Sequence, residues 1–444
     1  MGEALPVERL PTWPDSRIEL TPAARWLVDH GGESMPMEQL FAGFCERLAE
    51  EGIPLLRVIA ALPSMHPQVL SRAFFWRRGQ PVEVYSVGHD VTESDEYLNS
   101  PVWAIHQGAA AIRRRLDLPN APMDFGILPE LKEQGATDYL ALPMRFTQGP
   151  GFGTMQNDTR QRNVSFCSFT TDRPGGFTPG ELSYIMELMP LVSLRLEIEA
   201  GRRMTRDLLT TYLGRAPAKR VLKGNFHRGR GFEVEAAIWL SDLRGFTALS
   251  DRVGNQEMIA TLDDYFEAMA RPVQENEGEV LKFIGDGLLA IFRVDPELAK
   301  PGEDPREAAC RRALQAACGA FGQLDALNLK RAEAGQSALR AGIGLHLGKV
   351  VFGNIGATDR LDFTVIGRAV NEVARVETST KILSRPIVTS ATFAQALPNA
   401  GLESLGFHVL RGVKRPQELH GVPADKLVCG QTTAAATETE QKPD

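Results

Sequence analysis

The sequence predicts an α+β protein in which two domains are joined by a helical connector. Its 444 residues exceed the roughly 250–300 residues at which a single hydrophobic core stops growing. Apolar runs of strand length alternate with segments of helical periodicity in both halves, and the sequence ends in a polar stretch without such periodicity. We expect a lead-in at 1–30, a first domain at 31–180, a connector at 181–234, a second domain at 235–428 and a disordered tail at 429–444.

The first domain opens with a helix signal. Ser34 followed by Pro36 is typical of a helix start. Apolar residues then recur at helical spacing, namely Met37, Leu40, Phe41, Phe44 and Leu48. Strands are predicted at 55–62, 139–146 and 163–171, with mixed helix and loop at roughly 86–135.

The connector helix has a clear beginning. Thr178 can cap it, Pro179 suits its first position, and Glu181 completes a capping box. An apolar seam follows at spacings of three and four, made of Leu182, Ile185, Met189, Val192 and Leu196. This seam fits either a short coiled coil between two chains or packing on the domain's own sheet. Pro190 lies inside it, so we expect a kink or two abutting helices.

Composition restricts the partners and the compartment. A net charge of −7 argues against a general nucleic-acid or acidic-membrane binder. No signal peptide and no apolar run long enough to span a bilayer are visible. The cysteines are scattered, which suits a reducing cytoplasm and offers no zinc or disulfide framework; they are Cys45, Cys167, Cys310, Cys318 and Cys429. We expect a cytoplasmic protein.

Two acidic residues stand where a phosphate and its cation can bind. In AAIWLSDLRGFTALSD, an apolar strand runs into Asp242, and the glycine-containing turn that follows exposes backbone N–H groups to an anion. In VLKFIGDGLLAIF, Asp286 lies between two glycines at the tip of a hairpin, and Lys282 precedes it on the strand. Taken singly, the first could be a helix cap and the second an ordinary turn.

A third motif combines a hairpin with a helix. LRAGIGLHLGKVVFGNIG is apolar and glycine-rich, and it leads into DFTVIGRAVNEVARVE. Asn371 and Arg375 are four residues apart there, so they lie on one helix face. By itself, such a pair usually marks a solvated surface.

Together, the motifs resemble those of the class III nucleotidyl cyclase catalytic domain. The matching stretches are D-x-x-G-F-T at 242–247, K-F-I-G-D-G at 282–287, G-N-I-G at 353–356 and I-G-x-x-V-N-x-x-x-R at 366–375. The resemblance implies a ferredoxin-like βαββαβ fold for 235–428. The first domain resembles a GAF-like sensory domain, mainly in the stretch that ends it, and its small-molecule or protein regulator is unknown.

The resemblance also implies an adenylyl cyclase site. Asp242 and Asp286, with Leu243, would hold two Mg²⁺ or Mn²⁺ ions per site, because transfer of a nucleotidyl group requires neutralised phosphates. Asn371 would orient the ribose, and Arg375 would stabilise charge on the α-phosphoryl group. The remaining substrate-binding candidates are Gly245, Phe246, Thr247 and Arg411.

Base choice would fall to Lys282 and Thr364, a pairing similar to that of a subgroup with bicarbonate-responsive members. A lysine can donate to N1 of adenine, and a threonine hydroxyl can accept from its amino group. ATP is therefore the expected substrate, with guanylyl or dual specificity as the alternative. A catalytically silent cyclase fold is the alternative from another class. In this family the metal and base elements of one chain face the Asn and Arg elements of another, which implies a homodimer with shared sites.

Overall fold

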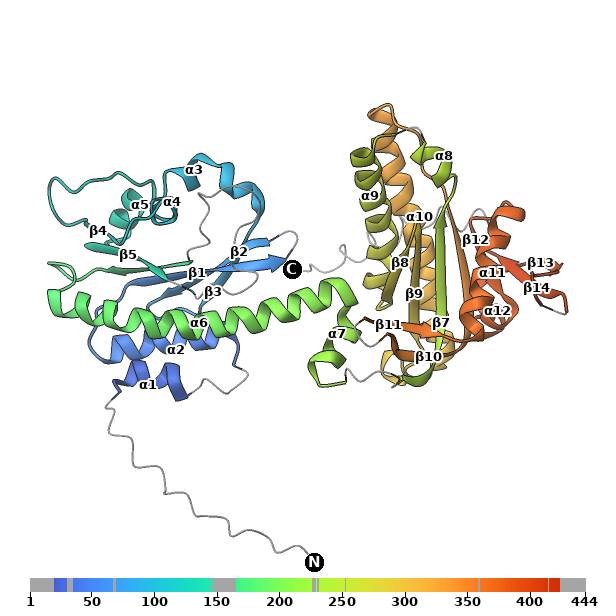
Figure 1. Ribbon diagram of the computed structural model, residues 1–444, viewed down its shortest axis with the longest axis horizontal. Helices are drawn as coiled ribbons and strands as arrows, with labels where there is room; N and C mark the ends of the chain where they lie inside the picture. The colour runs from blue at the N-terminus through green and yellow to red at the C-terminus, as the bar shows by residue number, and fades with distance from the viewer. Residues whose placement is uncertain are drawn as a thin grey trace, which may run out of the picture. The chain divides into compact units, whose positions relative to one another are not determined.

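The computed structural model describes most of the chain as two compact units, 1–208 and 209–444 (Figure 1). The described residues are 20–29, 35–66, 69–144, 146, 165–225, 229, 231–251, 253–357, 360–413 and 415–423. Most of the expected lead-in and the whole expected tail lie outside them. Within the described residues, no helix combines the length and apolar character needed to cross a membrane. Cys45, Cys167, Cys310 and Cys318 are free thiols.

The first unit is built on a six-stranded antiparallel sheet in the order β3-β2-β1-β6-β5-β4. The predicted strands are present with shifted ends. The strands are β1 (Arg57–His66), β2 (Val69–Arg77), β3 (Glu83–Val87), β4 (Ile112–Arg115), β5 (Asp138–Met144) and β6 (Ser165–Thr171).

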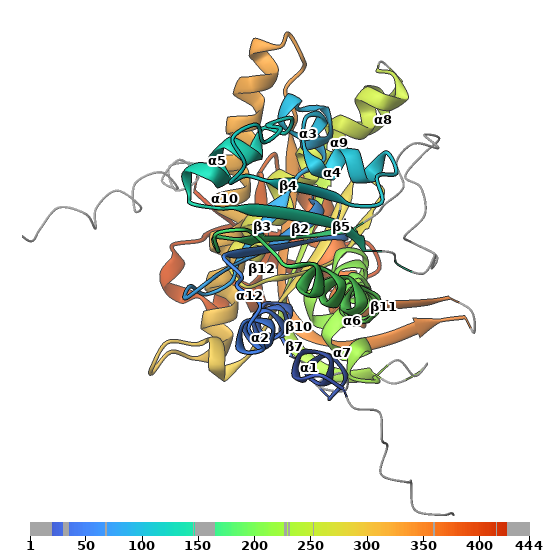
Figure 2. The same ribbon diagram turned by 90° about the vertical axis from the view of Figure 1, so that its left-hand side faces the viewer.

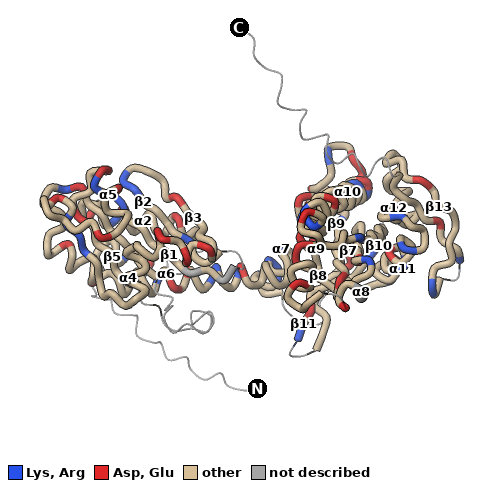
Figure 3. The backbone as a smooth tube through the Cα atoms, turned by 90° about the horizontal axis from the view of Figure 1, so that it is seen from above, with Lys and Arg blue, Asp and Glu red and all other residues tan. Residues whose placement is uncertain are grey.

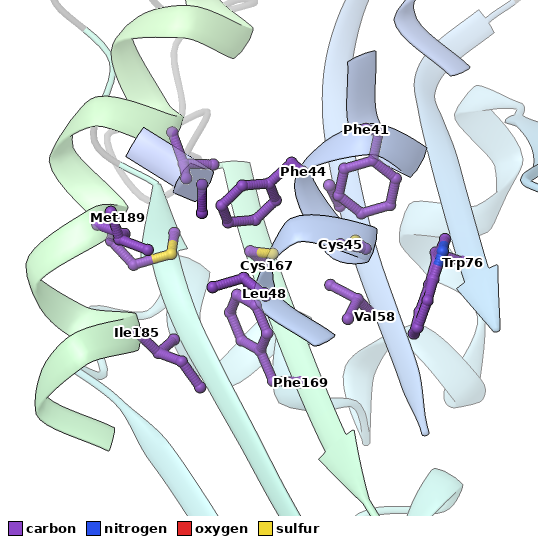
Figure 4. Packing of buried hydrophobic residues seen from close by; sticks show 14 of the residues in the cluster. Phe41, Phe44, Cys45, Leu48, Val58, Trp76, Cys167, Phe169, Ile185 and Met189 are labelled. Atoms are coloured by element: carbon purple, nitrogen blue, oxygen red, sulfur yellow. The ribbon is translucent and has the colours of Figure 1, made fainter. Parts of the chain in front are cut away.

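Helices cover both faces of this sheet, as the edge-on view in Figure 2 shows. On one side lie α1 (Pro22–Asp29), α2 (Met37–Glu50) and α6 (Pro179–Leu213); on the other lie α3 (Asp95–Leu98), α4 (Pro101–His106) and α5 (Ile127–Glu133). Side chains alternate between the faces of a strand. Val58 and Ala60 of β1 therefore join the core under α2 and α6, whereas Ile59 and Ala61 face α4 and α5. Figure 4 shows the former core, with Phe44 and Phe169 at its centre.

The α6 helix decides between the two alternatives for the apolar seam. Ile185, Met189, Val192 and Leu196 are all under 7% exposed in the core of their own sheet, so the seam packs within the unit. The capping box is confirmed, because the Thr178 N–H donates to Glu181 Oε2 at 2.8 Å and the Glu181 N–H donates to Thr178 Oγ1 at 3.3 Å. Pro190 lies inside one continuous helix, so two abutting helices do not form.

The second unit is built on an eight-stranded sheet in the order β13-β14-β12-β10-β7-β9-β8, with β11 paired to β10. Its pairs are antiparallel except for β10 with β12. The strands are β7 (Gly231–Leu243), β8 (Glu279–Ile284), β9 (Gly287–Arg293), β10 (Ala341–Gly356), β11 (Leu361–Ile366), β12 (Ile387–Ser390), β13 (Glu403–His408) and β14 (Gln417–Gly421).

Two cores lie on the two faces of this sheet, because β7 buries both of its faces. Ala237 and Trp239 pack with α9 (Asn255–Glu275), α10 (Pro305–Glu333) and α12 (Ala391–Ala396). Ala236 and Ile238 pack with α11 (Arg368–Ile382) and β11. Short α7 (Arg215–Leu222) and α8 (Phe246–Ser250) complete the helices. Acidic and basic residues are interspersed along both units (Figure 3).

Candidate functional site

Asp242 lies at the end of β7, on the face that α11 covers. It follows Ala236 and Ile238 at even spacing, so its side chain points to the same side as theirs. The side chain of the next residue, Leu243, is 3% exposed in the core on the opposite face. Of Leu243, therefore, only the backbone carbonyl can serve a cation.

Asp286 lies in the two-residue turn between β8 and β9, as the sequence predicts. Gly285 precedes it with a φ of 61°, the conformation that the first position of a type II′ hairpin turn requires. In the adjacent ladder Asp242 is paired with Gly287, which places the two carboxylates close together. Burial of the Asp242 carboxyl group, and next the negative charge of Asp286, raise the pKa of Asp242.

A third carboxylate, which the sequence analysis missed, belongs to Glu377 of α11. Its Oε1 is 3.1 Å from the position a Cβ would take on Gly342, the residue paired with Asp242 on β10. Its backbone nitrogen is 2.5 Å from the corresponding position on Gly344. Burial, and next the charge of Asp242, raise the pKa of Glu377 to about 7. The signal available in the sequence is the pair of alternate glycines, which lets a helix lie directly on the strand.

Two cations border these carboxylates. Arg244 Nη2 donates to Thr380 Oγ1 of α11 at 2.6 Å. Arg244 and Lys381 both act to lower the pKa of Asp242, but burial and Asp286 outweigh them. The described residues contain no group of three or more His, Cys, Asp and Glu side chains arranged to hold a metal ion. Two carboxylates suit Mg²⁺ or Mn²⁺, because these ions also take water and substrate phosphate oxygens as ligands.

The proposed base-reading residues lie apart from this cluster, on β8 and β11. Lys282 forms a hydrogen-bonded ion pair with Asp362, which the sequence analysis did not single out. Thr364 stands two residues further along β11, on the same face as Asp362, and is 8% exposed. The structure thus places one carboxylate acceptor, Asp362, beside Lys282, and Thr364 further along the same face of β11.

Asn371 and Arg375 occupy a different side of α11 from Glu377. At about 100° per residue, Glu377 is about 120° around the helix from Asn371 and about 160° from Arg375. The Arg375 guanidinium instead lies beside Gly412, with Nη2 3.4 Å from the position a Cβ would take there, so the turn that carries Arg411 is adjacent. One chain therefore does not bring Asn371 and Arg375 to its own carboxylates.

The remaining candidates form the turn after β7. Gly245 is exposed, and Phe246, the first residue of α8, is half-buried against the core. Thr247 follows on α8, and its side chain lies outside the described set.

Comparison with known proteins concerns the second unit. Residues 233–417 match the family model of the adenylate and guanylate cyclase catalytic domain. The second unit therefore contains a class III cyclase catalytic domain. It is similar to adenylate cyclase 1 of Rhizobium meliloti, with 28% identity over 51% of this chain and 33% of that protein. It is also similar to an adenylate cyclase of Anabaena cylindrica, with 34% identity over 35% of this chain and 30% of that protein.

A solved guanylyl cyclase, Cya2, is 29% identical over 43% of this chain and 93% of its own, with a TM-score of 0.38. The chain spans about a third of the length of the two adenylate cyclases. The resemblance of the first domain to GAF domains stays a prediction.

Proposed function

We propose that the protein is an adenylyl cyclase that converts ATP to 3′,5′-cyclic AMP and pyrophosphate and is regulated by its N-terminal domain. The observation that carries the proposal is the approach of Asp242 and Asp286 at one end of the sheet in a cyclase catalytic domain. A catalytically silent fold would have no use for a second carboxylate whose charge raises the pKa of Asp242.

Asp242 and Asp286 would hold two divalent cations, Mg²⁺ or Mn²⁺. When bound, these ions neutralise phosphate charge and favour ionisation of the attacking ribose 3′-hydroxyl. The two carboxylates fix where the triphosphate lies, with Arg244 and Lys381 beside them. In the turn after β7, the Arg244 N–H already donates to the Arg340 carbonyl at 2.7 Å, so the N–H groups from Gly245 onward would be the ones offered to the same phosphates.

Two chains would share each site. Because α11 turns Asn371 and Arg375 away from Glu377 and the aspartates, these residues would act on a nucleotide held by the partner's aspartates. Asn371 would orient the ribose, and Arg375, with Arg411 nearby, would stabilise the negative charge that develops on the α-phosphoryl oxygens. An apolar stripe on α6, made of Met186, Leu194 and Ile198 at 52%, 52% and 42% exposure, offers a second copy a contact surface.

The ion pair of Lys282 and Asp362 favours adenine over guanine. Lys282 can donate to N1 of adenine, and the Asp362 carboxylate can accept from its 6-amino group. Guanine presents a donor at N1 and an acceptor at O6, so its O6 would face the carboxylate unfavourably. Thr364 would act as a second acceptor on the same face. The alternative, a guanylyl or dual-specificity enzyme, predicts cyclic GMP formation at a comparable rate.

The test is incubation of the full chain with ATP or GTP and Mg²⁺ or Mn²⁺, with the cyclic product measured by chromatography. Asp286→Asn should abolish product formation, whereas Asp263→Asn, at an exposed position on α9, should not. Retained turnover in Asp286→Asn overturns the metal assignment.

Mixing variants tests the shared site. Asp286→Asn and Arg375→Ala should each be inactive alone, and mixed dimers should regain activity because one of their two sites is intact. Asp286→Asn mixed with Asp242→Asn should remain inactive. If the first mixture stays inactive although mixed dimers form, the sites are not shared in this way.

A further inference from the structure

The first unit contains two adjoining cavities of about 340 and 510 Å³ between its sheet and α3, α4 and α5. Their linings share five residues, Ile59, Glu96, Ser100, Val102 and Phe166. The floor comes from side chains of β1, β2 and β6 on the face opposite α2 and α6. Cavities of this size hold small molecules. Neither cavity plays a part in the cyclase reaction proposed above.

Arg57 is the unusual residue of the larger cavity. It lines the wall and is 6% exposed, yet its Nε and Nη1 are buried without a hydrogen-bond partner among the described residues. Its guanidinium carbon lies 5.3 Å from the centroid of the Phe75 ring, in a cation–π contact. Arg77 stands directly opposite on β2, which adds a like charge. A buried unpaired cation is costly, so its presence calls for an anion.

The other charges at the cavity offset that of Arg57 only in part. Glu130 lines the wall and its charge favours the cationic form of Arg57, but Glu130 and Glu96 are both exposed and neither forms an ion pair with Arg57 among the described residues. Glu130 instead accepts a hydrogen bond from Gln134 at 2.8 Å. The carboxylates of exposed glutamates can be solvated by water, whereas the buried guanidinium of Arg57 cannot. Their negative charge at the rim also disfavours a dianion.

The adjoining cavity is mainly apolar, with Leu70, Ala73, Phe75 and Val87 among its lining residues. Its lining includes Ser165, a buried residue whose Oγ also lacks a hydrogen-bond partner among the described residues. One cationic group next to an apolar chamber suits a ligand with a single carboxylate on an apolar body.

We propose that this cavity is the binding site of a small apolar monocarboxylate, with its carboxylate on Arg57 and its apolar part over Ile59 and Phe75. A phosphate monoester, as a dianion, should bind less well because of Glu96 and Glu130. The proposal is independent of the cyclase reaction, since its test measures binding.

The test uses 4-phenylbutyrate, its neutral isostere 4-phenylbutyramide and phenyl phosphate, each titrated by calorimetry into the full chain. A charge-assisted hydrogen bond predicts that the carboxylate binds about tenfold or more tightly than the amide. Arg57→Met should remove this preference. Arg77→Gln, which changes an exposed arginine opposite the same position, should keep it.

A second measurement separates a binding role from a structural one. Arg57→Met should melt at the same temperature as the wild type or higher, because it removes a buried charge without a partner. Equal binding of carboxylate and amide by the wild type, no binding of either at millimolar concentration, or an unchanged preference in Arg57→Met overturns the proposal. Tighter binding of phenyl phosphate than of the carboxylate overturns the monoanion assignment.

Discussion

Replacing Glu377 by glutamine tests whether three carboxylates crowd the end of β7. The folded protein raises the pKa of Glu377 from 4.5 to about 7, mainly through burial and the charge of Asp242. Its ionised form is therefore disfavoured by folding. The resulting loss of stability is absent below pH 4.5, grows between 4.5 and about 7, and is complete above that range. Glutamine keeps the shape of the side chain and removes its charge. The stability of the variant relative to the wild type should therefore increase as pH rises from 4.5 to about 7.

The size of the effect follows from the pKa difference. At 1.36 kcal/mol for each pKa unit, a change from 4.5 to about 7 corresponds to about 3.4 kcal/mol. Solvent screening of a partly exposed carboxylate reduces this to about 1–2 kcal/mol. For a domain of this size, that gain raises the melting temperature by roughly 2–8 °C.

Differential scanning calorimetry of the full chain in EDTA, at about pH 5 and about pH 8.5, measures the effect. The melting temperature of Glu377→Gln relative to wild type should rise between the two conditions. The control is Glu333→Gln at the exposed end of α10, whose difference should not change. Saturating Mg²⁺ should shrink the wild-type dependence. The reasoning is refuted if Glu377→Gln differs from wild type by the same amount at both pH values.

Three further changes probe the framework. Thr178→Ala removes the confirmed cap of α6 and should cost about 1 kcal/mol by calorimetry, whereas Thr178→Ser should cost almost nothing. Asp138→Asn, at a fully buried carboxylate paired with an arginine, should cost about 3 kcal/mol; a neutral result would contradict the pairing. Gly344→Ala places a Cβ against the backbone of α11 and should cost about 1–3 kcal/mol and lower cyclic-product formation. Gly322→Ala, in open space on α10, is its control.

Local chemistry made part of the molecule predictable. The cap formed by Thr178 and Glu181 and the turn at Gly285 and Asp286 depend on neighbouring residues. Helix periodicity also identified the buried face of α6. It could not decide whether a sheet or another chain covers that face, because both cover it with the same apolar side chains.

The functional residues that the sequence motifs did not indicate are defined by contacts between segments that lie far apart in the chain. Lys282 meets Asp362 across 80 positions of sequence. Glu377 reaches Asp242 only because β7 and α11 cross on one face of the sheet. Arg57 reads as an ordinary strand residue until burial leaves it without a partner. Periodicity indicates which side of an element is apolar, but it does not indicate which polar residues of two elements will meet.

The two-sided sheet of the first unit has a mechanical consequence. Along β1, Ile59 belongs to the floor of the cavities, and its neighbours Val58 and Ala60 are packed in the core that holds α6. Because Ile59 is bonded directly to Val58 and Ala60, a ligand that shifts the backbone at Ile59 would also shift these two residues on the opposite face. Val58 and Ala60 pack in the same core as Ile185 and Met189 of α6, a helix that continues to Leu213. A ligand that displaces β1 from the cavity side would therefore also disturb the packing of β1 against α6.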